Sequence, residues 1–284
     1  MPPSHYRTRI APTPTGYLHL GHGRTFVTTA ERARQRGGSI VLRMEDLDPA
    51  RCQSQFYDAA LEDLRWLGVD WDEGPDVGGP HAPYTQSQRM EIYRENLQAL
   101  KDSGQIYPCY CSRKDILNAS TAPHRGEDEW IYPGTCRPQG PTKTIDSRPH
   151  CWRYRVVDGE KWTFTDGGLG TVEFTAGEDF GDFVIWRRDD VPAYQLAVTV
   201  DDALMGITEV VRGSDLLVST ARQLALYRAF GWEPPRFYHC PLVLDENGDR
   251  LAKRNQSQSL RNLRALGETP GSLRKQWDQN LTRL

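Results

Sequence analysis

Two histidines, His19 and His22, lie three residues apart in a glycine-containing turn near the start of the chain. A strand-like segment precedes them and a helix-like segment follows, so the backbone N–H groups and the positive dipole end of the helix face one space. Gly16 and Gly21 carry no β-carbon and let a ligand approach closely. The imidazoles can donate hydrogen bonds to phosphate oxygens as charge builds on them. This pattern predicts a phosphate site, the alternative being that one histidine caps the helix and the other is buried.

An acidic group follows the second predicted strand, with Glu45, Asp46 and Asp48 ahead of Arg51. Carboxylates at the C-terminal edge of a strand lie where α/β folds bind their ligands. One carboxylate there would hold a substrate ammonium, and Arg51 would balance the others. The alternative is a surface cluster that caps the next helix.

A third group of polar residues lies at 248–254, directly after an Asn-Gly pair that is typical of a hairpin tip. Lys253 and its basic neighbours in such a loop can close over nucleotide phosphates and stabilise a pentacoordinate transition state. Basic loop residues are more commonly solvated, and the pattern alone does not decide between the two.

Three of the six cysteines form a group of their own, with Cys109 and Cys111 close together and Cys136 downstream. Structural zinc takes four tetrahedral ligands, and thiolates on both sides of a loop would hold together a subdomain too small for a large core. The fourth ligand could be His124, Tyr132 or an acid. Buried free thiols are the alternative.

Alternating strands and helices must position these groups. At the N-terminal end we expect a strand over 8–11, a helix over 23–35, a strand over 39–43, and helices over 56–67 and 87–104. Further along we expect strand-like segments over 194–200 and 207–211, a helix through Leu217 and Leu224, and a strand over 238–244. This order predicts an α/β fold, a doubly wound Rossmann-type parallel sheet.

The alternation of predicted strands and helices stops between residues 105 and 186. There Pro, Gly and Asp separate short strand-like segments, and the cysteine group lies in the same region. We therefore expect a Rossmann-type catalytic domain made of 1–104 and 187–250, an inserted α+β subdomain over 105–186 with the zinc site, and a signature loop and short helical tail over 251–284.

Composition limits the classes of function. The net charge of −3 argues against indiscriminate binding of nucleic acid. From Arg250 onward there are eight Lys or Arg against two Asp or Glu, a local +6 that leaves −9 for the rest. This basic tail could guide RNA or ATP, or simply be a solvated helical face. No apolar run approaches the roughly 20 residues of a membrane span, and the first residues lack a signal-peptide core, so we expect a cytoplasmic protein with no membrane partner.

The first three groups resemble those of one enzyme family. The string over residues 9–23, R-I-A-P-T-P-T-G-Y-L-H-L-G-H-G, resembles the HIGH signature of class I aminoacyl-tRNA synthetases in their glutamyl branch. The acidic segment resembles the R-[IF]-E-D-T-D block of that branch, with Leu47 in place of Thr. Residues 250–253 resemble the KMSKS loop, but Arg250 replaces its first Lys and Ala252 its Ser, which puts the rate of activation in doubt.

The resemblance implies roles for individual residues. The glutamate pocket would be lined by Arg9, Ile10, Ala11, Pro12, Thr13, Glu45, Tyr194 and Arg212. ATP would be bound by His19, Gly21, His22 and Lys253, of which His19, His22 and Lys253 would be catalytic, with Mg²⁺ accompanying the nucleotide. Glutamate has two carboxylates and one ammonium, and two Arg with one Glu complement these charges.

Chain length and the Cys-x-Cys insert narrow the resemblance. It covers about residues 7–255, and the 31 residues after Lys253 are too few for the helical anticodon-binding domain of a full glutamyl-tRNA synthetase. The chain is thus similar to the short glutamyl-Q tRNA(Asp) synthetase family, in which Tyr132 would join Cys109, Cys111 and Cys136 around a structural Zn²⁺.

That family activates glutamate with ATP without needing tRNA, then transfers it to the queuosine base in the anticodon of tRNA(Asp). The resemblance implies that L-glutamate, ATP and the tRNA(Asp) anticodon stem-loop are the partners of a monomer. A truncated glutamyl-tRNA synthetase that charges a tRNA 3′ end, or a regulatory module that binds without turnover, would also fit. A nucleotidylyltransferase with a His-x-Gly-His motif would leave the glutamate-like pocket unexplained.

Overall fold

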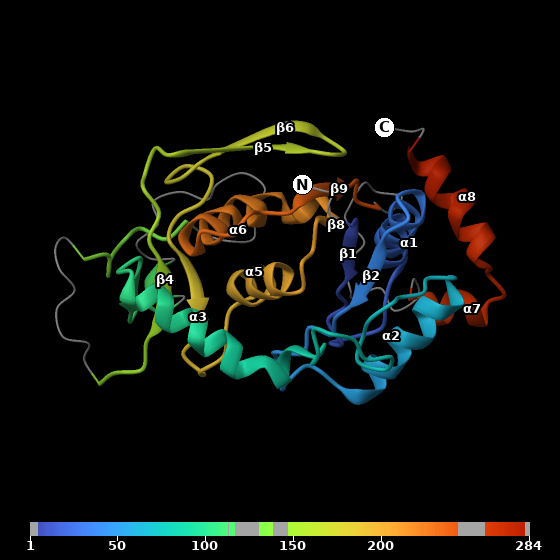
Figure 1. The fold of residues 1–284 in the computed structure, drawn as a ribbon, viewed down its shortest axis with the longest axis horizontal. Coiled ribbons are helices and arrows are strands. Elements are labelled where there is room, and N and C mark those ends of the chain that lie inside the picture. The colour runs from blue at the N-terminus through green and yellow to red at the C-terminus, as the bar shows by residue number, and fades with distance from the viewer. Residues whose placement is uncertain (1–4, 113, 117–130, 139–146, 244–258, 282–284) are drawn as a thin grey trace. The chain divides into compact units, whose positions relative to one another are not determined.

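The computed structural model describes residues 5–112, 114–116, 131–138, 147–243 and 259–281, with side chains up to Trp277. The chain divides into two compact units (Figure 1). The first unit contains residues 1–89, 205–216 and 235–284, and the second contains 90–204 and 217–234. The inserted subdomain expected over residues 105–186 does not coincide with either of these units, and it stays a prediction.

Parallel strand pairs form the centre of the first unit. β1 (Arg7–Ile10) pairs with β2 (Ser39–Leu42), and β8 (Glu209–Gly213) pairs with β9 (Arg236–Cys240), both in parallel. The Thr208 backbone N–H donates to the Arg7 carbonyl at 2.8 Å, which places the start of β8 beside β1. The strands are short, and β2 is a Ser-Ile-Val-Leu run whose last three residues are buried. Continuous apolar runs of this kind are typical of parallel strands covered by helices.

Four α-helices belong to the first unit: α1 (Leu20–Gln35), α2 (Ser54–Trp66), α7 (Leu260–Ala265) and α8 (Pro270–Leu281). Two 3₁₀ turns, η1 (Gln86–Arg89) and η2 (Ser214–Leu216), complete its described elements. Side chains of α1, α2 and both C-terminal helices share one apolar core with β1 and β2, including Ile10, Leu64, Leu260 and Trp277. Gly37, with φ of 57°, follows α1 and turns the chain into β2.

The described part of the second unit combines an antiparallel sheet with a hairpin and several helices. Its sheet has the order β3 (Ile106–Cys109), β4 (Cys151–Tyr154) and β7 (Phe183–Trp186). The strands β5 (Lys161–Asp166) and β6 (Gly170–Thr175) form a hairpin. The helices are α3 (Met90–Asp102), α5 (Tyr194–Leu204) and α6 (Leu217–Phe230). Cys109 and Cys151 stand opposite each other in the register of β3 and β4.

The α/β class is confirmed, with parallel and antiparallel pairing both present. The expected elements at the N-terminal end are present, and the tail is helical in α7 and α8. The strand expected over 194–200 is wrong, because these residues form most of α5. Eight consecutive residues from Gln195 to Asp202 are buried, and a helix buried on all sides can have the same continuous apolar pattern as a buried strand. The expected hairpin tip at 245–249 lies outside the described residues.

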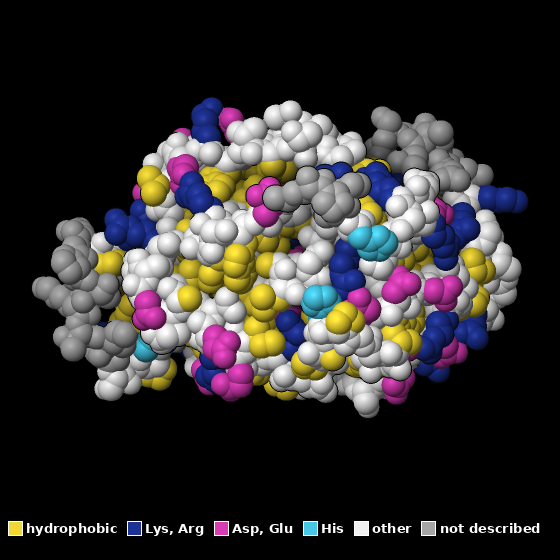
Figure 2. All heavy atoms as spheres, in the orientation of Figure 1, with side chains coloured by type: hydrophobic (Ala, Val, Ile, Leu, Met, Phe, Trp, Pro, Cys, Tyr) yellow, Lys and Arg dark blue, Asp and Glu magenta, His cyan; other side chains and the backbone are white. Residues whose placement is uncertain are grey.

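The C-terminal helices carry much of the positive charge expected for the tail. Figure 2 shows Lys and Arg side chains interleaved with acidic ones over α1, α2, α7 and α8. Arg264 of α7 forms an ion pair with Glu62 of α2 at 2.8 Å, and Arg274 of α8 lies 3.8 Å from Glu31 of α1. Part of the basic tail therefore neutralises acids of its own unit. Among the described helices, none is long and apolar enough to cross a membrane.

Candidate active site and metal centre

The two histidines lie where α1 begins, and the helix uses both of them. His19 is the N-cap residue, and its Nδ1 accepts from the Gly21 backbone N–H at 3.2 Å. The His22 Nδ1 accepts from the His19 N–H at 3.4 Å, which completes a reciprocal capping box. The two rings stack with centroids 3.7 Å apart. The capping alternative is therefore real, and it does not exclude phosphate binding.

The capping bonds fix the tautomer of each imidazole. A ring nitrogen that accepts a hydrogen bond carries no proton, so the proton of each neutral ring lies on Nε2. Each Nε2–H is then a donor that the cap does not use. The arrangement of two stacked donors at a helix N-terminus suits phosphate oxygens, which also gain from the dipole of α1.

Residues expected around glutamate meet at the ends of β1, β2 and β8. Arg9 on β1 donates from Nη1 to the Val211 carbonyl at 3.1 Å, which brings its guanidinium beside β8 one residue before Arg212. The Glu45 N–H donates to the Pro12 carbonyl at 3.0 Å. Arg9, Glu45 and Arg212 are 5%, 8% and 4% exposed. The first unit therefore holds Arg9, Glu45 and Arg212 buried at the ends of neighbouring parallel strands, with Glu45 at the turn that leads into α1.

The remaining predicted residues of this turn vary in exposure. Ile10 is fully buried and its carbonyl accepts from the Arg43 N–H at 2.9 Å. Pro12 is buried, Ala11 is half-buried and Thr13 is exposed. Tyr194 is the first residue of α5 in the second unit and is 37% exposed. Lys253 lies outside the described residues.

The segment around the predicted signature loop begins and ends in the first unit. Before the loop, the Pro241 carbonyl accepts from Arg24 of α1 at 3.4 Å. After it, Ser259 forms a β-bridge with His19, and the Leu260 N–H donates to the Leu18 carbonyl at 2.8 Å. Ser259 also caps α7 by accepting from the Asn262 N–H. Ser259, a few residues after the predicted loop, thus pairs directly with His19 of the histidine motif.

Two buried residues that contact predicted site residues, Arg43 and His239, were not expected from the sequence. Arg43 is fully buried, and its Nη2 lies 3.0 Å from Glu45 Oε1. Residues two apart on an extended chain share a face, so the Arg-x-Glu spacing was a usable signal. The Arg212 Nε donates to His239 Nε2 at 3.2 Å, and these residues stand opposite each other in the register of β8 and β9. Only the strand pairing brings them together.

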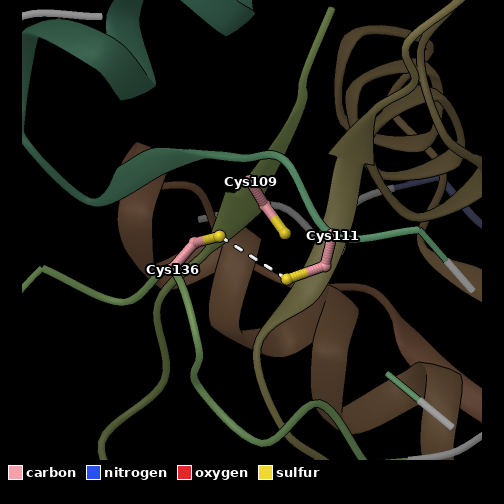
Figure 3. A group of neighbouring side chains, drawn as sticks. All are labelled: Cys109, Cys111 and Cys136. Carbon is pink, nitrogen blue, oxygen red and sulfur yellow. Dashed lines mark hydrogen bonds between the residues drawn. The ribbon is translucent and has the colours of Figure 1, made fainter. Parts of the chain in front are cut away.

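The three cysteines of the second unit point their sulfurs toward one another (Figure 3). All three Sγ atoms lie within 4.8 Å of each other, and those of Cys111 and Cys136 are 3.5 Å apart. Tetrahedral Zn–S bonds of about 2.3 Å place neighbouring sulfurs about 3.8 Å apart, so the spacing suits zinc. The Tyr132 hydroxyl lies 3.4 Å from Cys109 Sγ and 3.6 Å from Cys111 Sγ. The predicted ligands are therefore brought together as one four-donor set.

A buried cation stands beside this cluster. Arg153 lies over the Tyr132 ring, with its guanidinium carbon 3.9 Å from the ring centroid. A hydrogen bond from Cys151, followed by those from Tyr132 and Arg153, lowers the pKa of the Cys109 thiol to about 4. Thiolate is the form that binds metal, so the surroundings favour a ligand-ready Cys109. The Cys136 N–H donates to the Tyr132 hydroxyl oxygen at 2.7 Å and holds the phenol in place.

Comparison with known proteins decides the family. Residues 5–277 match the family described as tRNA synthetases class I (E and Q), catalytic domain. The chain belongs to this family. It is accordingly an enzyme of the ligase type, as the sequence motifs predict.

Individual relatives of this class I synthetase agree with the family. The chain is 50% identical to the glutamyl-Q tRNA(Asp) synthetase of Symbiobacterium thermophilum over 92% of its own length and 82% of the relative. It is 48% identical to the protein of that name from Nitratidesulfovibrio vulgaris, with the same coverage. Among solved structures, a glutamate tRNA ligase from Elizabethkingia meningosepticum in complex with its amino acid superposes with a TM-score of 0.76 at 30% identity. The chain covers 89% of itself but only 52% of that ligase, about half its length.

Proposed function

We propose that this class I synthetase activates L-glutamate with ATP and transfers it to the queuosine base in the anticodon of tRNA(Asp). The observation that carries the proposal is the grouping of Arg9, Glu45 and Arg212 at the strand ends that lead into the histidine-capped helix α1. Two glutamyl-Q tRNA(Asp) synthetases that are about half identical to the chain support the same acceptor.

The first step forms glutamyl-adenylate. An α-carboxylate oxygen of glutamate attacks the α-phosphorus of ATP, and pyrophosphate leaves with its Mg²⁺. The Nε2–H donors of His19 and His22, together with Lys253, stabilise the negative charge that builds on the phosphate oxygens. Glu45 holds the substrate ammonium, while Arg9 and Arg212 receive the carboxylates as paired donors. Residues 10–13 complete the pocket within the first unit, and the family resemblance assigns Tyr194 to glutamate binding as well.

The second step transfers the glutamyl group. A hydroxyl of the queuosine base attacks the carbonyl carbon of the mixed anhydride, the hydroxyl proton is lost, and AMP leaves. Activation that needs no tRNA is what the resemblance to glutamyl-Q tRNA(Asp) synthetases implies. Zn²⁺ held by Cys109, Cys111, Tyr132 and Cys136 supplies structural support to the inserted subdomain. We infer a cytoplasmic monomer, because its tRNA substrate is found there and one chain holds all the residues named.

The test supplies labelled glutamate, ATP and tRNA that contains queuosine, and then asks which nucleoside carries the label after nuclease digestion. Label on queuosine of tRNA(Asp) is expected. Label on the 3′ end of tRNA(Glu) would instead identify a truncated glutamyl-tRNA synthetase. Absence of glutamate-dependent ATP–pyrophosphate exchange would identify a binding module without turnover.

A pair of variants tests the mechanism in the same assay. His19→Ala combined with His22→Ala is expected to abolish pyrophosphate exchange. His81→Ala changes the same residue type in the first unit outside the motif and is expected to retain the exchange. Exchange that survives the double substitution would refute the role of these imidazoles.

A further inference from the structure

A basic hollow of about 390 Å³ lies in the second unit, apart from every residue assigned above. It is bounded by α3, by β4 with the residues before it, and by the turn after β7. Its lining includes Lys101, Arg148, His150, Trp152, Trp186 and Arg188. We call it the α3 groove.

Cations pack against aromatic rings in and beside this groove, and of these rings Trp152 is buried while His150 and Tyr110 are half-buried. The His150 ring lies between Tyr110 and Trp152, with centroids 5.5 Å and 5.3 Å away. The Arg148 guanidinium lies 4.4 Å from the Tyr110 ring centroid, and Lys101 Nζ lies 4.5 Å from that of Trp152. Surfaces that bind single-stranded nucleic acid combine these two elements, because cations attract phosphates and ring faces stack with bases.

The charge of the groove opposes that of the chain. Its lining has five Lys or Arg and one Asp, a formal +4, on a chain of net charge −3. Two of the cations are neutralised nearby, since Arg94 forms a two-bond ion pair with Asp190 and Arg187 pairs with Asp189. Within the described part of the chain, Lys101 and Arg188 form no ion pair. Burial lowers the pKa of Lys101, so its charge gains from an anionic ligand.

The groove also adjoins the cysteine cluster. Tyr110 stands between Cys109 and Cys111 in the sequence, and Arg188 donates from Nη2 to the Cys111 carbonyl at 2.7 Å. A cluster that fixes the two cysteines therefore also fixes the backbone on both sides of the Tyr110 ring. This gives the proposed metal site a role in shaping a surface as well as in folding.

We propose that the α3 groove is an RNA-binding surface that contacts tRNA phosphates through Lys101, Arg148 and Arg188 and offers the half-buried rings of His150, in its lining, and Tyr110, beside it, to an unpaired base. The assignment rests on the proposed function, which requires a tRNA, and it names the part of the chain that holds this substrate. RNA is favoured over an acidic protein partner because aromatic rings interleave with the cations.

The test is the double charge reversal Lys101→Glu with Arg148→Glu, assayed by binding of queuosine-containing tRNA(Asp) at several salt concentrations. Each lost phosphate contact lowers the slope of log affinity against log salt by about 1, so a decrease of about 2 is expected. The affinity at moderate salt should fall at least about tenfold. Glutamate-dependent pyrophosphate exchange, which does not involve the groove, should keep its wild-type rate.

Lys161→Glu is the matched control, because Lys161 is an exposed cation of the same unit on the β5–β6 hairpin, outside the groove. It should bind tRNA with the wild-type slope. If the double charge reversal disturbs folding, Lys101→Gln with Arg148→Gln removes the charges more gently and should show the same loss of slope. Wild-type affinity and slope in either folded double variant would overturn the groove assignment, as would tRNA binding by the wild type that does not depend on salt. Absence of exchange in the wild type would instead refute the proposed function.

Discussion

Substitutions in the buried pair of Arg43 and Glu45 can distinguish effects on the free energy of unfolding from effects on glutamate activation. The two side chains are 3.0 Å apart, and their exposed fractions are 0% and 9%. Glu45 is proposed to hold the ammonium of glutamate, and Arg43, which contacts Glu45, is proposed to position it. We therefore consider Arg43→Met, Glu45→Gln and the double variant together.

The magnitude follows from burial. At 3.0 Å and an effective dielectric of about 20, the Coulomb attraction is about 5 kcal/mol, and the desolvation of both ions offsets much of it. Removing one member leaves the other charge buried without this counter-ion, which costs about 3 to 5 kcal/mol. Removing both charges avoids that penalty. The double variant should therefore be at least about 2 kcal/mol more stable than the sum of the two single losses predicts.

Urea unfolding measures the stability, and pyrophosphate exchange over a range of glutamate concentrations measures function. The double variant should recover stability and still show a raised KM for glutamate, since its Glu45 carboxylate is gone. Arg51→Met is the control, because Arg51 pairs with Asp48 on the surface and should cost less than about 1 kcal/mol. A double variant whose loss of stability equals the sum of the two single losses would refute the coupling between Arg43 and Glu45. A double variant with a wild-type KM for glutamate would refute the role of Glu45.

Three further predictions concern other parts of the chain. Burial raises the pKa of Asp63 to about 7, so the stability contribution of its neutral carboxyl is complete below about pH 4 and is lost as the pH rises through 7. Relative to Asp63→Asn, the wild type should therefore lose about 2 to 4 kcal/mol of unfolding free energy between pH 4 and 8. A difference between the two proteins that stays constant with pH in urea unfolding would contradict this. Tyr132→Phe removes one metal donor and should lower zinc affinity more than about tenfold in chelator competition, whereas equal affinity would exclude the phenol as a ligand. A β-carbon on Gly38 would overlap Tyr6, so Gly38→Ala should cost about 1 to 3 kcal/mol in urea unfolding. It should cost more than Gly16→Ala, where the space is open and φ is not positive, and the opposite order would refute the steric argument.

Sequence patterns predicted correctly those helices and strands whose limits are set by neighbouring residues in the chain. Ser39–Leu42 is a short apolar run between a glycine turn and an acidic segment, and it forms β2 as expected. The helix after His19 has its own cap and begins three residues earlier than expected, because the capping pair is His19 and His22 rather than a serine or aspartate. The 194–200 segment failed because its composition does not distinguish a buried helix from a buried strand.

The candidate site depended on pairings that sequence spacing does not contain. Arg212 and His239 are 27 residues apart, and their hydrogen bond exists because β8 and β9 align in one register. The same is true of Arg9, whose guanidinium reaches the Val211 carbonyl. Family resemblance named Arg9 and Arg212 but could not supply the residues that hold them.

The capping box at His19 and His22 uses Nδ1 of each imidazole, whereas the proposed contact with phosphate uses Nε2. An asparagine amide places its oxygen near the position of Nδ1 and could keep the cap, while a glutamine amide extends toward the position of Nε2. Asparagine at these two positions should therefore keep the N-terminus of α1 capped while removing the Nε2 donors. Glutamine should keep a donor near the Nε2 position while removing the cap. The capping role of the imidazoles can thus be tested separately from their proposed role in catalysis.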